Sequence, residues 1–426
     1  MDPHPIVLTV DDDLRRNRLT VFFRLLLAIP HFLWLFVWSL VMFFAAILHW
    51  FVALVAGRPA GGLHRFMCSY LRYQVHLTAY LTLAGNPYPG FLGEEGEYPV
   101  DVELPAEPQR QPRLTILFRL LLAVPALLLS SAFAGTGGAQ FQYGRGVNAR
   151  ASGGGTIAFA CAFLGWFASL VQGRMPKGLR DAALYGIGYS AQTGAYLLLV
   201  TDRYPNSDPT ALLGGIERPP VHPVRIVGEP HDLRRSRLTV FFRLLLALPH
   251  LVWVSLWGVA VVLVSIPNWF VALFGGRPAR PLHRFAARWV RYRLHVGSFL
   301  YLVANPFPGF AGAEGSYPLD LELPDERRQD RWRTAFRILL AIPALIVDAA
   351  LGWALLVASV LTWFYALVRG SAPWGLRNLS AYALRYDAQT YAYLLLVTDA
   401  YPHASPLEGA EAELPPDHEP ALHPLA

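Results

Sequence analysis

Long apolar stretches alternate with short polar segments along the chain, and they recur four times. The first apolar stretch runs from Leu19 to Ala56. As one straight α-helix, its 38 residues would be about 57 Å long. That length is nearly twice the hydrocarbon thickness of a bilayer, about 30 Å. We therefore expect each stretch to fold back as a hairpin of two helices, each of about 20 residues.

The second apolar stretch indicates where these hairpins turn. It contains an extra segment, Gly135 to Gly155, which is rich in glycine and polar residues. Such a segment cannot lie in lipid, because its backbone groups would have no hydrogen-bond partners. We therefore expect it at a surface. By alignment, the turns of the other stretches fall at Ser39-Leu40, Gly258 and Gly352.

A short run of alternating apolar and polar residues precedes each apolar stretch. The clearest runs are residues 99–104 and 318–323, and both begin with proline. Alternation with a period of two is typical of a half-buried strand, and proline is tolerated at its first position. Segments 5–8 and 223–226 occupy the same place in the other repeats. We expect four strands in one small sheet outside the bilayer, with acidic strands beside Arg225.

A third helix of mixed character follows each apolar stretch, for example at residues 63–83. In the third repeat, Arg284, Arg288, Arg291 and His295 share one face at helical spacing. A basic, aromatic-rich amphipathic helix is typical of the headgroup plane of a membrane. The pattern also fits a spanning helix whose charges face the protein interior, which would invert neighbouring repeats. We favour the interfacial position, because inversion would place equal amounts of arginine on both sides of the membrane.

Internal self-similarity divides the chain into repeats. Residues 13–31 return at 232–250 with two substitutions, and weaker copies end at Pro125 and Pro343. The order of the units is A-B-A-B in two duplicated halves. The predicted units are residues 1–97, 98–221, 222–316 and 317–402. Residues 403–426 are acidic and rich in proline, so we expect a disordered tail.

These repeats share the pattern Arg…Ile-Pro-His…Trp-Phe…Gly-Arg-x-Pro…Leu…Arg…Ala-Tyr-Leu-Leu-Leu-Val-Thr-Asp-x-Tyr-Pro. The pattern resembles an uncharacterised bacterial membrane family, domain-of-unknown-function family 4389, over nearly the whole chain. The resemblance implies a bacterial integral membrane protein with tandem copies of the domain. It implies no activity, cofactor or catalytic residue. The fourth unit departs from the pattern at Ser371, where the other units have arginine.

Composition supports a membrane protein. Hydrophobic residues make up 54% of the chain, and charged residues only 15%, well below the roughly 25% of soluble domains. This content excludes disorder over most of the length. The only cysteines, Cys68 and Cys161, do not suggest a disulfide framework. We expect an all-α integral membrane protein with helical hairpins, amphipathic helices, a small cytoplasmic strand layer and pseudo-twofold halves.

The distribution of arginine predicts the sidedness of the chain. The net charge is +6, and Lys177 is the only lysine. Residues 1–18 lack the basic and apolar regions of a signal peptide. Arginine flanks both ends of each predicted hairpin, so the positive-inside rule places both ends in the cytoplasm. We therefore expect a multi-pass protein of the bacterial cytoplasmic membrane with a cytoplasmic N-terminus.

Arginine side chains provide the candidate contacts for anions or lipid headgroups. Each apolar stretch carries one arginine about a turn and a half inside its first helix, and the third helices carry others. The candidates are Arg24, Arg119, Arg243, Arg337, Arg72, Arg284, Arg288, Arg291 and Arg385. Those in the apolar helices either extend to the headgroups along their aliphatic stems or form a ring that binds lipid phosphates or another anion. Simple solvation at the interface is the alternative for those in the third helices.

Three ionisable residues lie inside apolar segments: Asp348, His31 and His250. An intramembrane ionisable group suggests function, because burying it in lipid is costly. Asp348 is a candidate for a proton or ion role, or alternatively an acid paired with a partner. The two histidines follow a proline, and they are either packed in the core or act as a switch or ligand.

No catalytic or metal-binding motif accompanies these residues. The sequence has no zinc-site spacing, phosphate-binding loop or nucleophile elbow. We expect no enzyme activity, no cofactor, no metal and no nucleic-acid partner. The predicted partners are membrane lipids, with anionic lipids among them. The predicted function is a non-enzymatic scaffold or lipid-headgroup-interacting module; the alternative is a transporter or channel for a small anionic solute.

Overall fold

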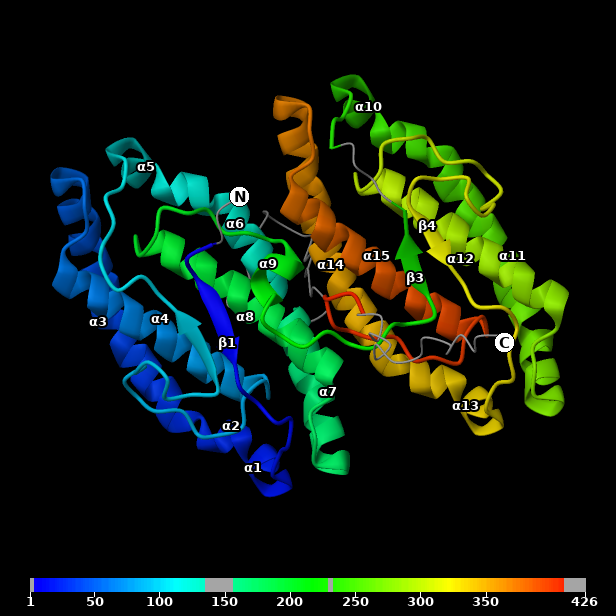
Figure 1. Cartoon of the computed structure of the whole chain (residues 1–426), viewed down its shortest axis with the longest axis horizontal. Helices are drawn as coiled ribbons and strands as arrows, with labels where there is room; N and C mark the ends of the chain where they lie inside the picture. Colours follow the sequence, from blue (N-terminus) through cyan, green and yellow to red (C-terminus); the bar gives the residue numbers. More distant parts are fainter. Residues whose placement is uncertain (1–3, 135–155, 229–232, 410–426) are drawn as a thin grey trace, which may run out of the picture.

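The computed structural model describes residues 4–134, 156–228 and 233–409. It is mostly helical, with two small sheets (Figure 1). The helices are α1 (Arg18–Phe22), α2 (Arg24–Leu27), α3 (Ile29–Ala56), α4 (Gly61–Leu81), α5 (Arg113–Leu117), α6 (Arg119–Ala134), α7 (Ile157–Gln172), α8 (Lys177–Leu197), α9 (Pro209–Leu213), α10 (Arg237–Phe241), α11 (Arg243–Gly275), α12 (Arg280–Leu300), α13 (Arg331–Ala335), α14 (Arg337–Arg369) and α15 (Trp374–Leu394). The strands are β1 (Val7–Val10), β2 (Val100–Glu103), β3 (Arg225–Val227) and β4 (Asp320–Glu322).

The apolar stretches of three units form long helices rather than hairpins, so the predicted turns are wrong there. Helix α3 passes through Ser39-Leu40, α11 through Gly258 and α14 through Gly352. A glycine inside a helix costs only about 1 kcal/mol. A turn would instead leave several backbone groups without partners in apolar surroundings. In the second unit, α6 and α7 contact each other, and the predicted loop 135–155 lies outside the described residues.

Each long helix ends at a glycine that starts the return of the chain. Gly57, Gly173, Gly276 and Gly370 all have φ near +70°, the left-handed conformation that glycine adopts most readily at a helix C-terminus. A few residues later, a 21-residue helix begins: α4, α8, α12 or α15. The long helix contacts the helix that follows it in every unit. The hairpin of this fold is therefore formed by a long apolar helix and the third helix of the same unit.

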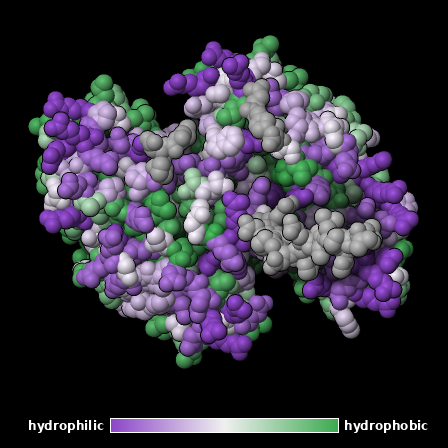
Figure 2. Space-filling model, in the orientation of Figure 1, coloured by the Kyte–Doolittle hydropathy of each residue, from purple (hydrophilic) through white to green (hydrophobic). Residues whose placement is uncertain are grey.

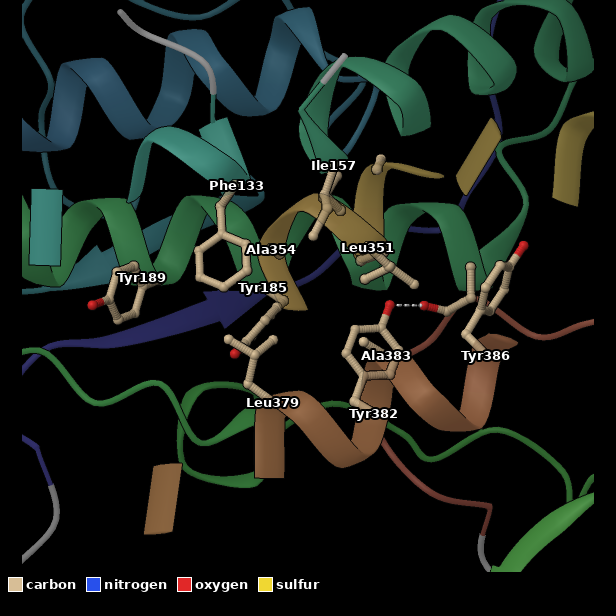
Figure 3. Close-up of a cluster of buried hydrophobic side chains, with 14 of the residues drawn as sticks. Phe133, Ile157, Tyr185, Tyr189, Leu351, Ala354, Leu379, Tyr382, Ala383 and Tyr386 are labelled. Atoms are coloured by element: carbon tan, nitrogen blue, oxygen red, sulfur yellow. Dashed lines mark hydrogen bonds between the residues drawn. The ribbon is translucent and has the colours of Figure 1, made fainter. Parts of the chain in front are cut away.

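The third helices lie in the interior of the protein. Helices α4 and α8 contact each other, as do α12 and α15, while α14 contacts α6 and α7 and so links the two halves. Figure 3 shows the aromatic core at this junction, where the Tyr185 ring packs against Phe133 (4.9 Å between ring centroids) and Tyr382 (6.2 Å). The predicted headgroup-facing surface of α12 includes Arg284 and Arg288, which are exposed. It is wrong for Arg291 and His295, which are buried.

The strands form two separate two-stranded antiparallel sheets, β1 with β2 and β3 with β4. The prediction of one four-stranded sheet is wrong, because each strand pairs within its own half of the chain. The predicted proximity of Arg225 to an acidic strand is confirmed: its Nε lies 2.5 Å from Glu322 Oε2. Figure 2 shows that hydrophilic residues predominate on the face of the molecule seen in Figure 1.

Neighbouring units in each half exchange hydrogen bonds at their helix ends. Trp50 in α3 donates from Nε1 to the Ile116 carbonyl in α5 (2.9 Å), and Trp166 in α7 donates to the Val21 carbonyl in α1 (3.0 Å). In the second half, Trp269 and Trp363 make the equivalent bonds to the carbonyls of Thr334 and Val240. Each indole adds a donor to a carbonyl in the last turn of a short helix, which also faces the backbone N–H of the residue that caps that helix.

The start of the predicted disordered tail is ordered. Residues 403–409 pack against α15, where Tyr382 Oη donates to the Ala404 carbonyl at 2.6 Å and Arg385 Nη2 donates to the Ser405 carbonyl at 2.6 Å. Leu407 is buried. Residues 410–426 lie outside the described residues.

Candidate functional site

The arginines at the start of the apolar helices are buried and bonded to backbone carbonyls. Arg24, Arg119, Arg243 and Arg337 are only 1–2% exposed. Arg24 Nη1 donates to the carbonyls of Tyr80 (2.6 Å) and Gly85 (3.2 Å). Its guanidinium also lies over the Tyr80 ring, 4.3 Å from the centroid. These contacts satisfy carbonyls at the end of α4 and add a cation–π interaction.

The same arrangement recurs in the other units, with differences between A and B. Arg243 Nη1 bonds the carbonyls of Phe299 (2.5 Å) and Ala304 (3.3 Å). In the B units, a glutamine that the sequence analysis missed accepts a bond from the arginine: Gln111 for Arg119 and Gln329 for Arg337. The prediction that these arginines contact lipid headgroups is wrong, because buried guanidinium groups bonded to protein carbonyls are not open to a lipid.

Arg72 and Arg291, on the third helices of the A units, bind a buried aspartate. Arg72 Nε lies 3.2 Å and His76 Nε2 lies 3.0 Å from Asp101 Oδ1, and Asp101 precedes Val102 on β2. In the third unit, Arg291 and His295 make the same contacts with Asp320 on β4, at 3.1 Å and 3.0 Å. Both arginines are 8% exposed, so the predicted headgroup contacts are wrong for them too. The charged groups join each third helix to a strand.

The environment of these two aspartates stabilises their ionised forms. Burial alone would raise the pKa of the Asp101 carboxyl, but hydrogen bonds from His76 and from the Gly96 and Val102 amides hold that pKa below its usual range. The pKa of Asp320 is lowered in the same way, against burial, by the Gly315 amide and its neighbours. Each site is therefore a charged structural connection.

In the B units, glutamine replaces this histidine and reaches a strand segment directly. Gln192 Nε2 donates to the Ile6 carbonyl (2.9 Å), and Gln389 Nε2 donates to the Val224 carbonyl (3.0 Å). Arg385, a predicted headgroup contact, is 7% exposed and donates to the Ser405 carbonyl. The prediction for Arg385 is therefore also wrong.

His31 and His250 are packed in the core. Both are 0% exposed. His31 Nδ1 lies 2.9 Å from Tyr73 Oη, and its ring stacks on Phe91 with 4.3 Å between centroids. His250 makes the same contacts with Tyr292 (2.7 Å) and Phe310 (4.2 Å). Among residues 4–134, 156–228 and 233–409, no group of three or more histidine, cysteine and acidic side chains is placed to hold a metal.

Asp348 does have charged neighbours, which the sequence analysis missed. It lines a cavity between α11, α12, α14 and α15, together with Arg293 and Asp387. Arg293 donates from Nε and Nη2 to the two carboxylate oxygens of Asp387, at 2.8 Å and 2.7 Å. A signal for this cluster was present in the sequence, since Arg293 and Asp387 replace Gln74 and Ser190 of the first half.

The exposed arginines lie mainly at the ends of the apolar helices. Arg18, Arg113, Arg237 and Arg331 are exposed at the starts of the short helices α1, α5, α10 and α13. Each donates to a carbonyl in the last turns of the neighbouring unit's apolar helix. Arg58, Arg174 and Arg277 follow the ends of these helices and are also exposed. Arg284 and Arg288 on α12 are exposed as well.

The fold and these sites define a helical protein of four repeats with helices long and apolar enough to cross a membrane. Three such helices are present in the described part of the chain: Arg24–Ala56, Arg243–Gly275 and Arg337–Arg369. The family model described as domain of unknown function (DUF4389) matches residues 18–93, 152–207, 237–311 and 331–405. The chain belongs to this family, as the sequence pattern predicted. No curated protein and no solved structure matches it.

Proposed function

We propose that the protein is a non-enzymatic membrane module that embeds its long apolar helices in the bilayer and binds anionic lipid headgroups with exposed arginines at their ends. The observation that carries the proposal is the exposed apolar surface of each long helix. Along the first, Leu25 is 71% exposed, Phe36 73% and Val55 74%. Water would disfavour this surface at about 25 cal/mol per Å², whereas lipid tails accept it.

The proposed headgroup contacts are the exposed arginines, which differ from most of those expected from the sequence. Arg18 donates one bond, from Nη2, to the Val171 carbonyl, and the side chain remains exposed. A guanidinium at the end of an apolar helix can bind a lipid phosphate bidentately. Arg284 and Arg288 on α12 are available in the same way.

The proposed topology is multi-pass in the bacterial cytoplasmic membrane, with pseudo-twofold halves, a cytoplasmic strand layer and a cytoplasmic N-terminus. Arg15, Arg16 and Arg18 precede the first long helix, which favours a cytoplasmic start under the positive-inside rule. A long helix spans 33 residues, about 50 Å at the rise of an α-helix. A helix of that length tilts or bends to fit a bilayer.

An anion transporter has less support. An arginine-lined anion path needs open guanidinium groups, whereas Arg243 and Arg291 are bonded to carbonyls and a carboxylate inside the protein. A headgroup-binding module needs only arginines at the surface, and the arginines at the ends of the apolar helices are exposed.

Lipid binding by full-length variants tests the proposed function. The protein in detergent micelles is titrated with fluorescent phosphatidylglycerol, with fluorescent phosphatidylcholine as the neutral reference. We expect Arg18→Gln/Arg237→Gln and Arg284→Gln/Arg288→Gln each to weaken phosphatidylglycerol binding by about fivefold per arginine, since one basic residue near an anionic surface contributes about 1 kcal/mol.

Arg218→Gln is the matched control, because Arg218 is exposed but lies in the segment that joins the halves. It should leave the preference for phosphatidylglycerol unchanged. Equal binding of both lipids by the wild type, or unchanged phosphatidylglycerol binding in both double variants, would overturn the headgroup proposal.

A further inference from the structure

The second half of the chain contains a cavity of about 270 Å³ with charged and apolar walls. Helix α11 contributes Leu251 and Val254, and α12 contributes Arg293. Asp348 comes from α14 and Asp387 from α15. The cavity lies between two long apolar helices and two third helices, so its entrance is bordered by the surface that we propose to face lipid.

Acidic side chains outnumber basic ones in the lining of this cavity. Arg293 and Asp387 form a bidentate pair, and the Arg293 guanidinium also lies over the Tyr391 ring, 4.2 Å from the centroid. Asp348 lines the same cavity as this pair, yet it accepts no hydrogen bond that the described residues show. The lining of the cavity therefore contains two carboxyl groups and one guanidinium.

The first half has a neutral version of the same cluster. Ser130 takes the place of Asp348, and Ser130 Oγ lies 3.0 Å from Ser190 Oγ, at the position of Asp387. Gln74 takes the place of Arg293 and bonds to Tyr70 Oη at 3.0 Å. The fold therefore does not require charges here. Burial in apolar surroundings favours the protonated form of a carboxyl group, and a bound cation would stabilise the ionised form.

We propose that this cavity is a binding site for a small organic cation with an ammonium group on a short apolar chain. The ammonium donates charge-assisted hydrogen bonds to Asp348, and the apolar chain contacts Leu251, Val254 and Leu384 on the wall. One free carboxylate and an apolar wall suit an alkylammonium better than a metal ion, which needs several oxygen ligands.

Two sources supply this chemistry: a free amine and the ammonium of a lipid headgroup. The entrance favours neither by charge, since α11 contributes only apolar residues to the lining. Val252 on α11 and Trp353 on α14, each next in sequence to a lining residue, are 59% and 41% exposed. An experiment must therefore decide whether the ligand is a lipid headgroup or a free amine from the water phase.

Calorimetric titration of the full-length protein in phosphatidylglycerol nanodiscs tests the proposal. Butylammonium chloride is the probe, and sodium chloride and sodium butyrate are the references. We expect saturable binding of butylammonium at one site and none of butyrate. Asp348→Asn should weaken binding at least tenfold. Ser130→Ala, at the equivalent position of the first half, should leave the affinity unchanged.

Three results would overturn the proposal: no butylammonium binding above the sodium reference, unchanged affinity in Asp348→Asn, or binding of butyrate that Arg293→Gln abolishes. Circular dichroism and gel filtration establish that each variant is folded. Should Asp348→Asn fail to fold, Asp348→Ser/Asp387→Ser/Arg293→Gln reproduces the neutral cluster of the first half, and it must then lose binding.

Nanodiscs that also contain phosphatidylethanolamine identify the source of the ligand. Competition from that headgroup, seen as weaker butylammonium binding than in phosphatidylglycerol alone, supports the site with a lipid amine as its ligand. Equal affinity in both membranes supports the site with a free amine. Neither result depends on the surface arginines, so the headgroup proposal stands or falls separately.

Discussion

Individual buried arginines repeat one structural role in three of the four units, those of Arg24, Arg243 and Arg337. Arg24 and Arg243 both donate to a carbonyl at the end of the third helix and to a second carbonyl beyond it. A planar guanidinium can reach two acceptors at once, whereas a lysine ammonium is a point charge. The residue therefore ties the start of an apolar helix to the end of its partner helix.

Arg24→Ala should lower the free energy of unfolding by about 2–4 kcal/mol, because it leaves the buried Gly85 carbonyl without a donor and removes a charge-assisted bond to the Tyr80 carbonyl, which keeps the Leu83 amide. Denaturant unfolding in detergent micelles measures the change. Arg65→Ala is the control, since Arg65 is exposed on α4, and it should change the stability by less than about 0.5 kcal/mol. Equal losses in the two variants would show that the Arg24 contacts contribute nothing special.

Single residues were also hard to place from the sequence. Arg24 and Arg72 were found by repeat position and helical spacing, and they do recur as predicted. Their burial could not be predicted, because hydrophobic periodicity identifies a polar face without saying whether it faces water or the protein interior. In a protein whose outer surface is apolar, polar faces turn inward. The pair of Arg293 and Asp387 was missed because it joins two helices that are far apart in the sequence, and helical spacing describes only one helix at a time.

At the scale of elements, each third helix of the A units is fixed to a strand by one carboxylate. Asp101 on β2 binds Arg72 and His76 on α4, and Asp320 on β4 binds Arg291 and His295 on α12. The B units use the uncharged Gln192 and Gln389 to reach the other strand segments. Only the A-type connections should therefore respond to pH.

Acid should weaken the A-type connections. The pKa values of Asp101 and Asp320 are lowered in the folded protein, so their contribution to stability is present above the unfolded-state pKa of about 3.9. It is lost as the pH falls through the folded-state values. Melting temperatures measured from pH 7 to pH 3 should fall less steeply for Asp101→Asn/Asp320→Asn than for the wild type. If the melting temperatures of the variant and the wild type fall equally with pH, these two carboxylates are not the cause of the acid sensitivity.

The elements themselves were partly predictable. The strand segments, the third helices and the order of the units follow from alternation, helical spacing and repetition. The hairpin turns at Gly258 and Gly352 were wrong because the length of an apolar run was compared with the bilayer thickness. Length alone does not break a helix. The backbone hydrogen bonds that a turn would lose outweigh the weak helix propensity of one glycine.

At the scale of the whole molecule, the continuous helices change the expected topology. A hairpin would return Arg15 and Arg58 to one side of the membrane, whereas α3 separates the two positions by its full length. Both residues are exposed, and the native cysteines are buried. These positions therefore offer a clean comparison.

Single-cysteine labelling in intact cells and inverted membrane vesicles should place the two positions on opposite sides. With a membrane-impermeant maleimide, Arg58→Cys should react in cells and Arg15→Cys only in inverted vesicles, as a cytoplasmic N-terminus requires. The unmodified protein measures background labelling of Cys68 and Cys161. Reaction of both variants from one side would show that the first long helix does not cross the membrane.

The exchange of tryptophan bonds between neighbouring units has a consequence for how such proteins can evolve. Trp50 and Trp166 each donate to the helix end of the other unit, so a solitary copy would keep an unused indole donor. Two copies are the smallest number in which every such tryptophan has its carbonyl partner. A relative with one copy should therefore assemble as a homodimer, and lineages that lengthen the gene should add copies in even numbers, as tandem duplication of a former dimer would do.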